Sequence, residues 1–353
     1  MTHQYRMVQW NRHKRIYDAL ALVCIVLFIG AFIIGGKLAY SGASALSDEV
    51  LLLRALGVCA FLMLHIVLCI GPLARFSDRF APLLYNRRHL GVLTFVVGLG
   101  HAALTVLYYG GFGDKNPVAA LLAHEGATAT ISGFPFEWLG FAALLILFVM
   151  AATSHDFWLA SLSPRVWKRL HMLVYGAYAS LVLHVLLGVL QSEPSPVYPA
   201  LLASGVATVA GLHIAAGLKE ARRNRAAPSG ADGWIDAGLA ADLPEKRGRI
   251  ICLSGGERVA LFRHDGKISA TSNVCAHQGG PLGEGEIIDG CLTCPWHGYQ
   301  YLPESGTSPP PYSEKIATYE VRIEGGRVLI NPAACAPGAP VEPTRFEGAP
   351  TDE

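Results

Sequence analysis

Apolar residues dominate the N-terminal part of the chain in six separate runs. They cover residues 19–40, 50–73, 90–109, 136–153, 170–190 and 199–218. Each run has roughly the 17–25 residues that an α-helix needs to cross a bilayer. The pattern therefore predicts a membrane α-helical bundle of six transmembrane helices at residues 16–218. The first run is too long for the apolar part of a secretory signal peptide, so we expect it to remain as an anchor.

Positive charge lies beside these runs on one side only. The first side comprises residues 1–15, 74–89, 154–169 and 219–225, and the opposite side comprises residues 41–48, 110–135 and 191–198. The first side holds 15 Lys and Arg residues and the second side holds only Lys115. Loops rich in Lys and Arg stay in the cytoplasm. We therefore predict a cytoplasmic N-terminus at residues 1–15 and a multi-pass protein of a bacterial inner (plasma) membrane.

The pattern changes after residues 219–231, an Arg-rich and then Ala/Pro/Ser/Gly-rich stretch that we interpret as a linker. Short segments with strand composition then alternate with Gly-containing turns. The expected strands include 249–253, 259–263, 267–270, 318–323 and 327–330. They predict a small all-β domain at residues 232–332, on the cytoplasmic side. The tail at 333–353 is rich in Pro and Ala with mixed charge, a composition typical of disorder.

Composition narrows the classes of function. The chain of 353 residues is 52% hydrophobic and 16% charged, and its formal net charge is +1. Such a composition indicates a membrane protein and suggests no nucleic-acid partner. The eight Cys residues are scattered and form no disulfide framework. The sequence has no CxxCH motif, which excludes c-type haem, and no GxGxxG motif for a nicotinamide or flavin domain.

Two Cys–His pairs lie in the predicted β domain. Cys275 and His277 form the first pair, and Cys294 and His297 form the second. Two thiolates on one iron and two imidazoles on the other are the ligands of a Rieske 2Fe–2S cluster. The same four residue types can also hold zinc. The Gly-rich run at 278–283 and the glycine after the second pair favour the iron–sulfur cluster, because zinc fingers do not use two Gly-rich loops.

The two loops resemble the Rieske ferredoxins of ring-hydroxylating dioxygenases. High-potential Rieske proteins of the respiratory bc complexes carry an extra Cys in each loop and a Ser after the second His-Gly. In this chain those places hold Gly280, Trp296 and Tyr299. Fewer hydrogen bonds to the cluster sulfurs lower the reduction potential. Tyr301 remains as one candidate donor of such a hydrogen bond.

Five histidines lie within the apolar runs, namely His65, His101, His171, His184 and His213. Imidazole is costly in hydrocarbon, so each is a functional candidate. One interpretation is a neutral histidine that is hydrogen-bonded between helices. The other is ligation of b-type haem by neutral imidazoles that face each other across the bundle. We interpret His213, near the inner end of the last run, as structural.

Residues 50–190 resemble the ferric-reductase-type transmembrane domain. The resemblance rests on Asn-Arg-Arg-His-Leu-Gly at 86–91 ahead of His101, and on Trp-Lys-Arg-Leu-His at 167–171 ahead of His184. The third and fifth helices supply the haem ligands in that family. The resemblance therefore implies His101, His171 and His184 as haem ligands. His65 lies on the second helix and departs from the family's pattern.

Depth suggests how these histidines pair. Counted from the cytoplasmic helix ends at ~1.5 Å per residue, His65 with His171 forms an inner haem site and His101 with His184 an outer one. His171 and His184 do not share a face, because the 13 residues between them turn an ideal helix through about 220°. Either Gly176 marks an irregular turn or only one haem is bound. The basic residues nearby are either partners of the haem propionates or only markers of the cytoplasmic side. These are Arg87, Arg88, Lys168 and Arg169.

Together these features predict a transmembrane electron-transfer protein. A cytoplasmic flavin reductase or ferredoxin would reduce the Rieske cluster, which would pass electrons to b haem and on to a periplasmic or membrane acceptor. The alternatives are a terminal reductase of ferric chelate or oxygen at the outer face, and a subunit that feeds a periplasmic reductase or exchanges electrons with quinone. An oxygenase component is not favoured, because the chain has no 2-His-1-carboxylate motif. The sequence identifies no catalytic residue.

Overall fold

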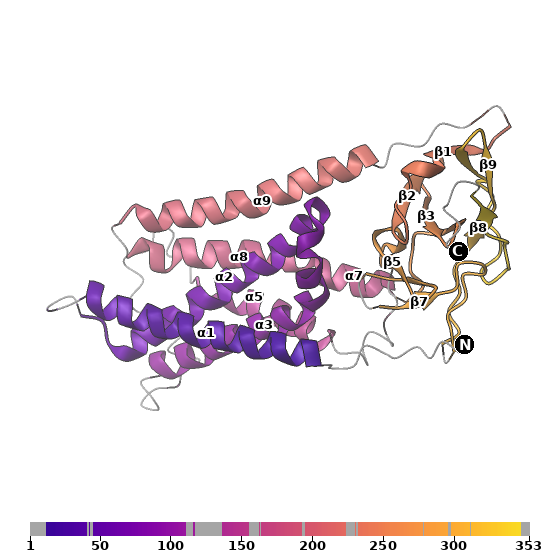
Figure 1. Cartoon of the computed structure of the whole chain (residues 1–353). Coiled ribbons are helices and arrows are strands. Elements are labelled where there is room, and N and C mark those ends of the chain that lie inside the picture. Colours follow the sequence, from indigo (N-terminus) through magenta and orange to yellow (C-terminus); the bar gives the residue numbers. More distant parts are fainter. Residues whose placement is uncertain are drawn as a thin grey trace. The chain divides into compact units, whose positions relative to one another are not determined.

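The computed structural model describes residues 12–40, 42, 45–110, 116, 136–154, 162, 164–192, 195–223, 230, 232–277, 279–295, 298–310 and 312–346. The chain divides into two compact units (Figure 1). One unit, at Asn11–Ala216, is helical. The other, which contains Gly217–Glu353, consists mainly of β-strands.

The helical unit follows the apolar runs closely. Its helices are α1 (Arg12–Ala39), α2 (Asp48–Phe76), α3 (Ala81–Tyr109), α5 (Glu137–Ala152), α7 (Pro164–Met172), α8 (Val174–Leu187) and α9 (Val197–Arg223). Within the described residues, five spans are long and apolar enough to cross a membrane, with α7 and α8 together forming one of them. The α5 helix is a shorter apolar helix of 16 residues. The predicted helical bundle is confirmed, with five full-length spans and α5 as a shorter sixth.

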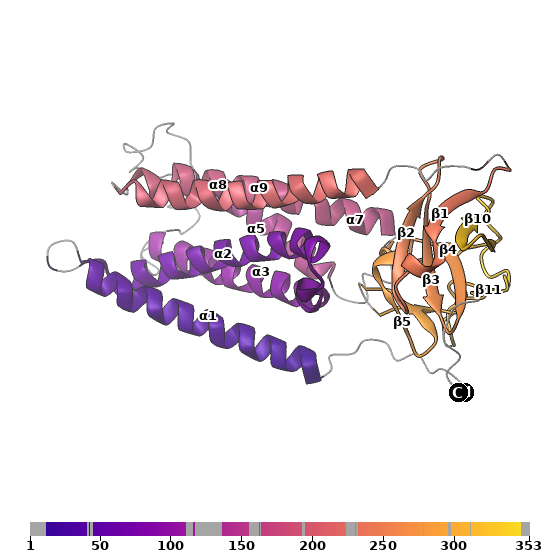
Figure 2. The ribbon, with the colours of Figure 1, turned by 45° about the horizontal axis from the view of Figure 1, so that its top comes forward.

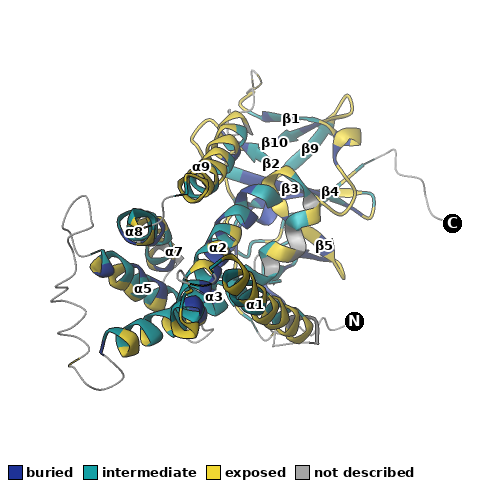
Figure 3. Ribbon diagram, turned by 90° about the vertical axis from the view of Figure 1, so that its left-hand side faces the viewer, coloured by how far each residue is buried: buried dark blue, intermediate teal, exposed yellow. Residues whose placement is uncertain are grey.

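Helix packing leaves much apolar surface outside. The α2 helix packs against α3, and α5 packs against α8. Leu64, Leu147, Tyr178 and Val209 belong to one buried cluster that joins α2, α5, α8 and α9. By contrast, α1 exposes large apolar side chains along its length, and Figure 3 shows this as a mainly yellow helix. In a membrane such surfaces face the lipid chains, where only segments with all backbone groups paired are stable.

A break separates the two histidines of the fifth span. The α7 helix ends at Met172 and α8 begins at Val174, with Leu173 between them in a turn. His171 therefore lies on α7, and His184 lies on α8. The irregular turn expected at Gly176 occurs three residues earlier, so the rotation of an ideal helix does not relate the two side chains.

The β unit contains three small antiparallel sheets, seen best in Figure 2. Its strands are β1 (Ile235–Leu239), β2 (Gly248–Cys252), β3 (Arg258–His264), β4 (Lys267–Ser272), β5 (Glu286–Ile288), β6 (Cys291–Thr293), β7 (Gln300–Tyr301), β8 (Thr318–Tyr319), β9 (Val321–Glu324), β10 (Arg327–Ile330) and β11 (Thr344–Arg345). The sheet orders are β1-β10-β9, β11-β4-β3-β2 with β8 also on β4, and β5-β6-β7. The predicted strands at 249–253, 259–263, 267–270 and 327–330 are confirmed, and the segment at 318–323 forms two strands, β8 and β9.

The prediction of a disordered tail from residue 333 is wrong for residues 333–346. The backbone N–H of Val341 donates to Glu304 at 2.7 Å, and β11 pairs with β4 through Thr344 and Ile268. Phe346 packs against the core of the β unit, with the Arg263 guanidinium 5.0 Å from its ring centroid. The edge of β4 offers unpaired backbone groups to any extended segment. Composition does not reveal such an edge. It therefore predicts disorder for a tail that pairs with β4 in the folded structure.

The predicted linker also begins later than residue 219. The α9 helix continues to Arg223, so the first five residues of the predicted linker are helical. Lys219 and Glu220 continue the helix readily, because both are good helix formers. Residues 224–229 and 231 lie outside the described part of the chain.

Candidate functional site

The loops that carry Cys275 and Cys294 are built alike. In each loop the Cys carbonyl accepts a hydrogen bond from the glycine four residues later, Gly279 at 2.7 Å and Gly298 at 2.9 Å. In each loop the Cys N–H donates to the carbonyl five residues later, that of Gly280 at 2.9 Å and that of Tyr299 at 2.8 Å. The sequence shows two Cys–His pairs with different spacings, and the structure shows one loop geometry used twice.

Glycine is required at the fourth residue of both loops. Gly279 has φ +73° and Gly298 has φ +70°, a backbone conformation that other residues rarely adopt. These two positions let each chain turn back over its Cys. The glycines that favoured an iron–sulfur cluster in the sequence therefore have a specific structural role.

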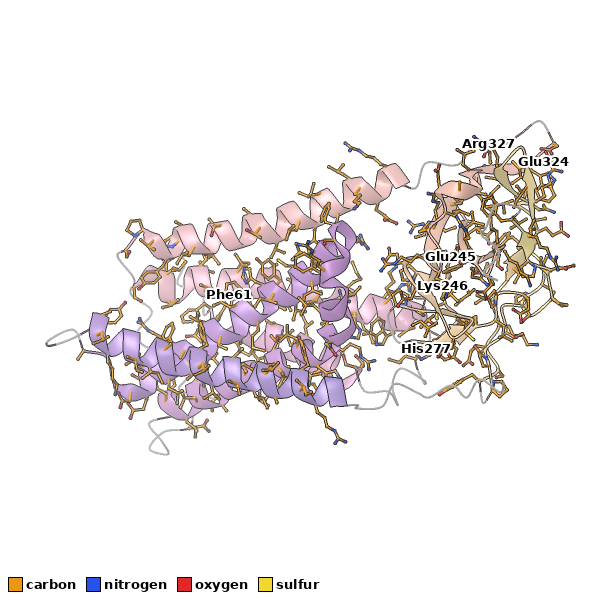
Figure 4. All side chains as sticks on the ribbon, in the orientation of Figure 1. Phe61, Glu245, Lys246, His277, Glu324 and Arg327 are labelled. Carbon is orange, nitrogen blue, oxygen red and sulfur yellow. The ribbon has the colours of Figure 1, made fainter. Side chains whose placement is uncertain are left out.

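The two cysteine thiols lie in the buried interior of the β unit. Cys275 and Cys294 are each only 2% exposed and belong to one buried cluster. His277 follows β4 on the first loop, where Figure 4 labels it. His297 lies outside the described residues, so its predicted role as a ligand stays a prediction. Among the described residues, no three His, Cys, Asp or Glu gather around a point that could hold a single metal ion. Zinc needs four donors around one ion, whereas a 2Fe–2S cluster divides its ligands between two irons. Two buried Cys on loops of one geometry fit a cluster that divides its ligands in this way.

Tyr301 is placed to stabilise a cluster sulfur. Its hydroxyl lies 3.3 Å from Cys275 Sγ and accepts a hydrogen bond from the backbone N–H of Ala276 at 3.0 Å. Burial, followed by the neighbouring Cys275 sulfur, raises the pKa of Tyr301 above its ordinary value. The hydroxyl therefore keeps its proton and can donate a hydrogen bond to a thiolate at Cys275. The structure places Tyr301 where the expected hydrogen bond requires it.

Replacing Tyr301 with Phe should lower the reduction potential of the cluster. A hydrogen bond to sulfur stabilises the reduced, more negative state of the cluster. Loss of a hydrogen bond worth about 1 kcal/mol lowers a one-electron reduction potential by about 40 mV. A redox titration monitored by EPR measures this change. Tyr312→Phe is the matched control, since Tyr312 packs on Tyr299, with the ring centroids 5.1 Å apart, rather than on a cysteine. An unchanged potential in Tyr301→Phe would show that the hydroxyl does not donate to the sulfur.

Tyr299 has a role that the sequence did not reveal. Its ring stacks on His277 with the centroids 4.8 Å apart and the planes 11° apart. Its hydroxyl donates to the Glu314 carboxylate. Tyr299 thus fixes the ring orientation of a predicted ligand, and Glu314 fixes Tyr299. No sequence pattern identifies Glu314, which lies 15 residues further along the chain.

Cys291 is not part of a redox-active CxxC pair with Cys294. It is fully buried on β6, and burial raises the pKa of its thiol to about 11. A thiol with this pKa is protonated at neutral pH, whereas redox-active cysteines need a thiolate. This environment is that of a cysteine that packs within a strand.

His101 and His184 meet in the helical unit. Their ring centroids are 6.5 Å apart, and the ring planes are 83° apart. His101 Nδ1 bonds the Leu53 carbonyl at 3.0 Å, and His184 Nδ1 bonds the Phe136 carbonyl at 2.9 Å. A carbonyl only accepts, so Nδ1 carries the proton in both rings and each Nε2 keeps its lone pair. A metal–imidazole bond of about 2 Å on each side separates two ring centroids by roughly 6 Å. The pair therefore has the tautomer and the spacing of a bis-histidine haem site.

The other membrane histidines have different partners. His65 Nδ1 bonds the carbonyl of Phe61, which Figure 4 labels, and its Nε2 lies 2.9 Å from the Tyr178 hydroxyl. His171 Nδ1 bonds the Trp167 carbonyl at 3.1 Å, and its Nε2 lies 3.5 Å from Ser154 Oγ. The structure thus gives His65 and His171 protein partners of their own, and their pairing as an inner site stays a prediction. His213 also bonds a carbonyl of its own helix, that of Val209 at 2.9 Å.

The basic residues at the cytoplasmic helix ends differ in their surroundings. Arg88 donates to the Ser154 carbonyl, and Arg87 lies against Gly71 of α2. Lys168 and Arg169 are exposed. The structure therefore places Arg87 and Arg88 inside the bundle, near His171. A role with haem propionates stays a prediction for all four residues.

Comparisons with known proteins divide the chain in the same way. The Rieske 2Fe–2S domain family matches residues 233–320, and the ferric reductase like transmembrane component family matches residues 56–182. The ferredoxin component of a naphthalene 1,2-dioxygenase system from Pseudomonas aeruginosa is 33% identical over 100 residues, which are 28% of this chain and 94% of that protein. The chain belongs to the Rieske family and joins its Rieske domain to a ferric-reductase-like transmembrane domain.

Further relatives of the Rieske domain are similar ferredoxins. The ferredoxin component of an alkene monooxygenase system from Xanthobacter autotrophicus is 36% identical over 77 residues, which are 22% of this chain and 63% of that protein. A solved Sphingomonas yanoikuyae ferredoxin is 25% identical and covers 28% of this chain and 99% of its own, with a TM-score of 0.27. The family itself establishes an electron-transfer role for this multi-pass membrane protein, with a Rieske-type 2Fe–2S cluster.

Proposed function

We propose that the chain carries single electrons across a bacterial inner membrane. The donor is a cytoplasmic flavin reductase or ferredoxin, and the acceptor lies in the periplasm or in the membrane. The observation that supports this proposal best is the approach of His101 and His184 in the helical unit, with both Nε2 lone pairs available. A Rieske domain in the same chain supplies the other half of an electron path.

In this proposal, each group of residues has a defined task. His101 and His184 hold a b-type haem, while Cys275 and Cys294 bind one iron of the cluster and His277 and His297 bind the other. The cluster and the haem, when bound, each take up and release one electron at a time.

A second, inner haem held by His65 and His171 remains part of the proposal. Both Nε2 atoms now face hydroxyls, Tyr178 OH at 2.9 Å and Ser154 Oγ at 3.5 Å. Binding of an inner haem therefore requires both hydroxyls to turn away. The contact of Ser154 with His171 is the weaker one, because it is long and the Ser154 hydroxyl donates to the Met150 carbonyl at 2.7 Å. We therefore expect His171 to be released more easily than His65.

Purified protein should contain b-type haem in a fixed ratio to the cluster. The pyridine haemochrome spectrum, compared with acid-labile sulfide, gives one haem per chain if only the outer site binds and two if the inner site also binds. In sealed inverted vesicles, whose cytoplasmic face points outward, a reductant outside should reduce an acceptor trapped inside. Absence of haem from protein made with ample haem supply would contradict the proposal. The assay is repeated with ferric chelate, oxygen or quinone as the acceptor. Reduction of ferric chelate or oxygen indicates a terminal reductase, whereas reduction of quinone alone indicates a partner subunit.

The Rieske domain should lie on the cytoplasmic side. The charge pattern supports this orientation, with 15 basic residues on one side and Lys115 alone on the other. A reporter that is active only in the periplasm, fused after Glu353, should therefore be silent. The same reporter inserted between Asn116 and Pro117, in the loop between α3 and α5, should be active. The reverse pattern of activity would overturn the orientation and the direction of electron flow.

A further inference from the structure

His101 and His184, the proposed ligands of the outer haem, each lie directly against a glycine of the neighbouring helix. A Cβ added at Gly57 of α2 would lie 3.0 Å from His101 Cε1 and 3.1 Å from its Nδ1. A Cβ added at Gly140 of α5 would lie 2.9 Å from both the Cε1 and the Nδ1 of His184. Any side chain at these positions would push the imidazole away from its place.

The two histidine surroundings repeat at one offset along the chain. Each imidazole bonds a carbonyl 48 residues earlier, that of Leu53 for His101 and that of Phe136 for His184. Gly57 and Gly140 each follow that carbonyl by four residues, one helical turn, so carbonyl and glycine lie on the same helix face. The α2–α3 pair and the α5–α8 pair therefore hold their histidines in equivalent ways.

Other histidines of the membrane spans lack this arrangement. His65, His171 and His213 each bond the carbonyl four residues earlier on their own helix. Such a bond forms within one helix and requires no close approach of a neighbour. A glycine at the contact lets a helix bring its carbonyl close to the ring of a neighbouring helix. A glycine also lies against His65, since a Cβ added at Gly205 of α9 would lie 2.8 Å from its Nε2, but the Nδ1 of that ring bonds a carbonyl of its own helix. The pairing of a carbonyl from a neighbouring helix with a glycine one turn later thus distinguishes His101 and His184 from these three histidines.

We infer that Gly57 and Gly140 are positioning residues of the haem site. They allow α2 and α5 to approach so closely that Leu53 and Phe136 accept the Nδ1 protons of His101 and His184. These bonds fix the tautomer of both rings and hold the ring planes 83° apart. The inference rests on the proposed haem ligation and adds the helices and residues that orient the ligands.

Two physical consequences follow from this arrangement. A hydrogen bond from Nδ1 to a carbonyl makes the imidazole a stronger donor to a metal, which favours ferric iron. Nearly perpendicular ring planes leave a bis-histidine ferric haem with a highly anisotropic low-spin EPR signal, whereas parallel planes give a rhombic one. The wild-type protein should therefore show the highly anisotropic signal.

The test replaces each glycine with alanine. Gly57→Ala and Gly140→Ala should shift the EPR signal away from the highly anisotropic form, raise the haem reduction potential, and weaken haem affinity about tenfold or more. Gly140→Ala should have the larger effect, because its methyl group lies closer to the ring. The matched controls are Gly100→Ala on α3 and Gly176→Ala on α8. An added Cβ meets nothing within 4 Å at either position, and alanine favours a helix.

The helical circular dichroism signal per chain, recorded on the same samples, reports whether the helical unit of each variant is assembled. If Gly57→Ala or Gly140→Ala binds no haem but keeps this signal, its imidazole has lost the ligating position, which supports the inference. Unchanged EPR and unchanged potential in both variants would overturn it and leave the haem proposal intact. A rhombic signal in wild-type protein would also overturn it. Haem-free wild-type protein would instead refute the proposed function on which the inference rests.

Discussion

Cys294→Ser should abolish the Rieske-type EPR signal, whereas Cys291→Ser, three residues earlier, should retain it. Both cysteines are almost fully buried, at 2% and 0% exposure. Their chemistry differs, because a serine hydroxyl cannot replace a thiolate ligand at Cys294. At Cys291 the thiol is protonated and only fills space, so serine costs packing and a buried polar group but no ligand. EPR of dithionite-reduced protein, with iron and acid-labile sulfide per chain, measures the difference.

Equal loss of the Rieske-type EPR signal in Cys291→Ser and Cys294→Ser would indicate that both cysteines of the CxxC motif hold the cluster. That result would contradict the proposed pairing of Cys275 with Cys294. Bound zinc with no acid-labile sulfide in the wild type would contradict an iron–sulfur centre at this site. His277→Ala supplies an independent check on the imidazole side, because it should remove the Rieske signal as well. The retention of haem in all three variants shows that the helical unit is assembled.

His101→Ala and His184→Ala should each remove the same haem. The ring centroids are 6.5 Å apart, and a haem held between the two rings would lose one of its histidine ligands in either variant. The reduced-minus-oxidised spectrum of each variant should therefore lose the same low-spin band, while chemical reduction of the Rieske cluster continues. His213→Ala is the matched control, because its ring bonds only its own helix and packs on Tyr175.

His65→Ala and His171→Ala test the inner pair in the same measurement. The loss of a second, distinct haem in both variants would establish the inner site. Unchanged haem content would leave His65 and His171 as groups that join helices through Tyr178 and Ser154. Loss of the outer haem in His213→Ala but not in His101→Ala would contradict the assignment of ligands.

Residue types and local pattern alone predicted the architecture of this protein. Long apolar runs require membrane helices, and short alternating segments between glycine turns require strands. Cys275 and Cys294 were identifiable because an iron–sulfur cluster needs thiolates in loops, and such residues have few other uses in that context. Tyr301 was identifiable because it lies seven residues beyond a ligand, on the strand that follows the second loop.

Contacts between segments far apart in the chain were decided by the tertiary structure. A helix that is apolar on every side gives no hint of which face meets which neighbour. Depth along the helices predicted that His101 pairs with His184, but the sequence could not show that Leu53 and Phe136 accept their Nδ1 protons or that His65 bonds Tyr178. The ordered tail at Phe346 and the bond from Tyr299 to Glu314 depend in the same way on surfaces that exist only after folding. Local periodicity reports the environment of one element, whereas a binding site is made where several elements meet.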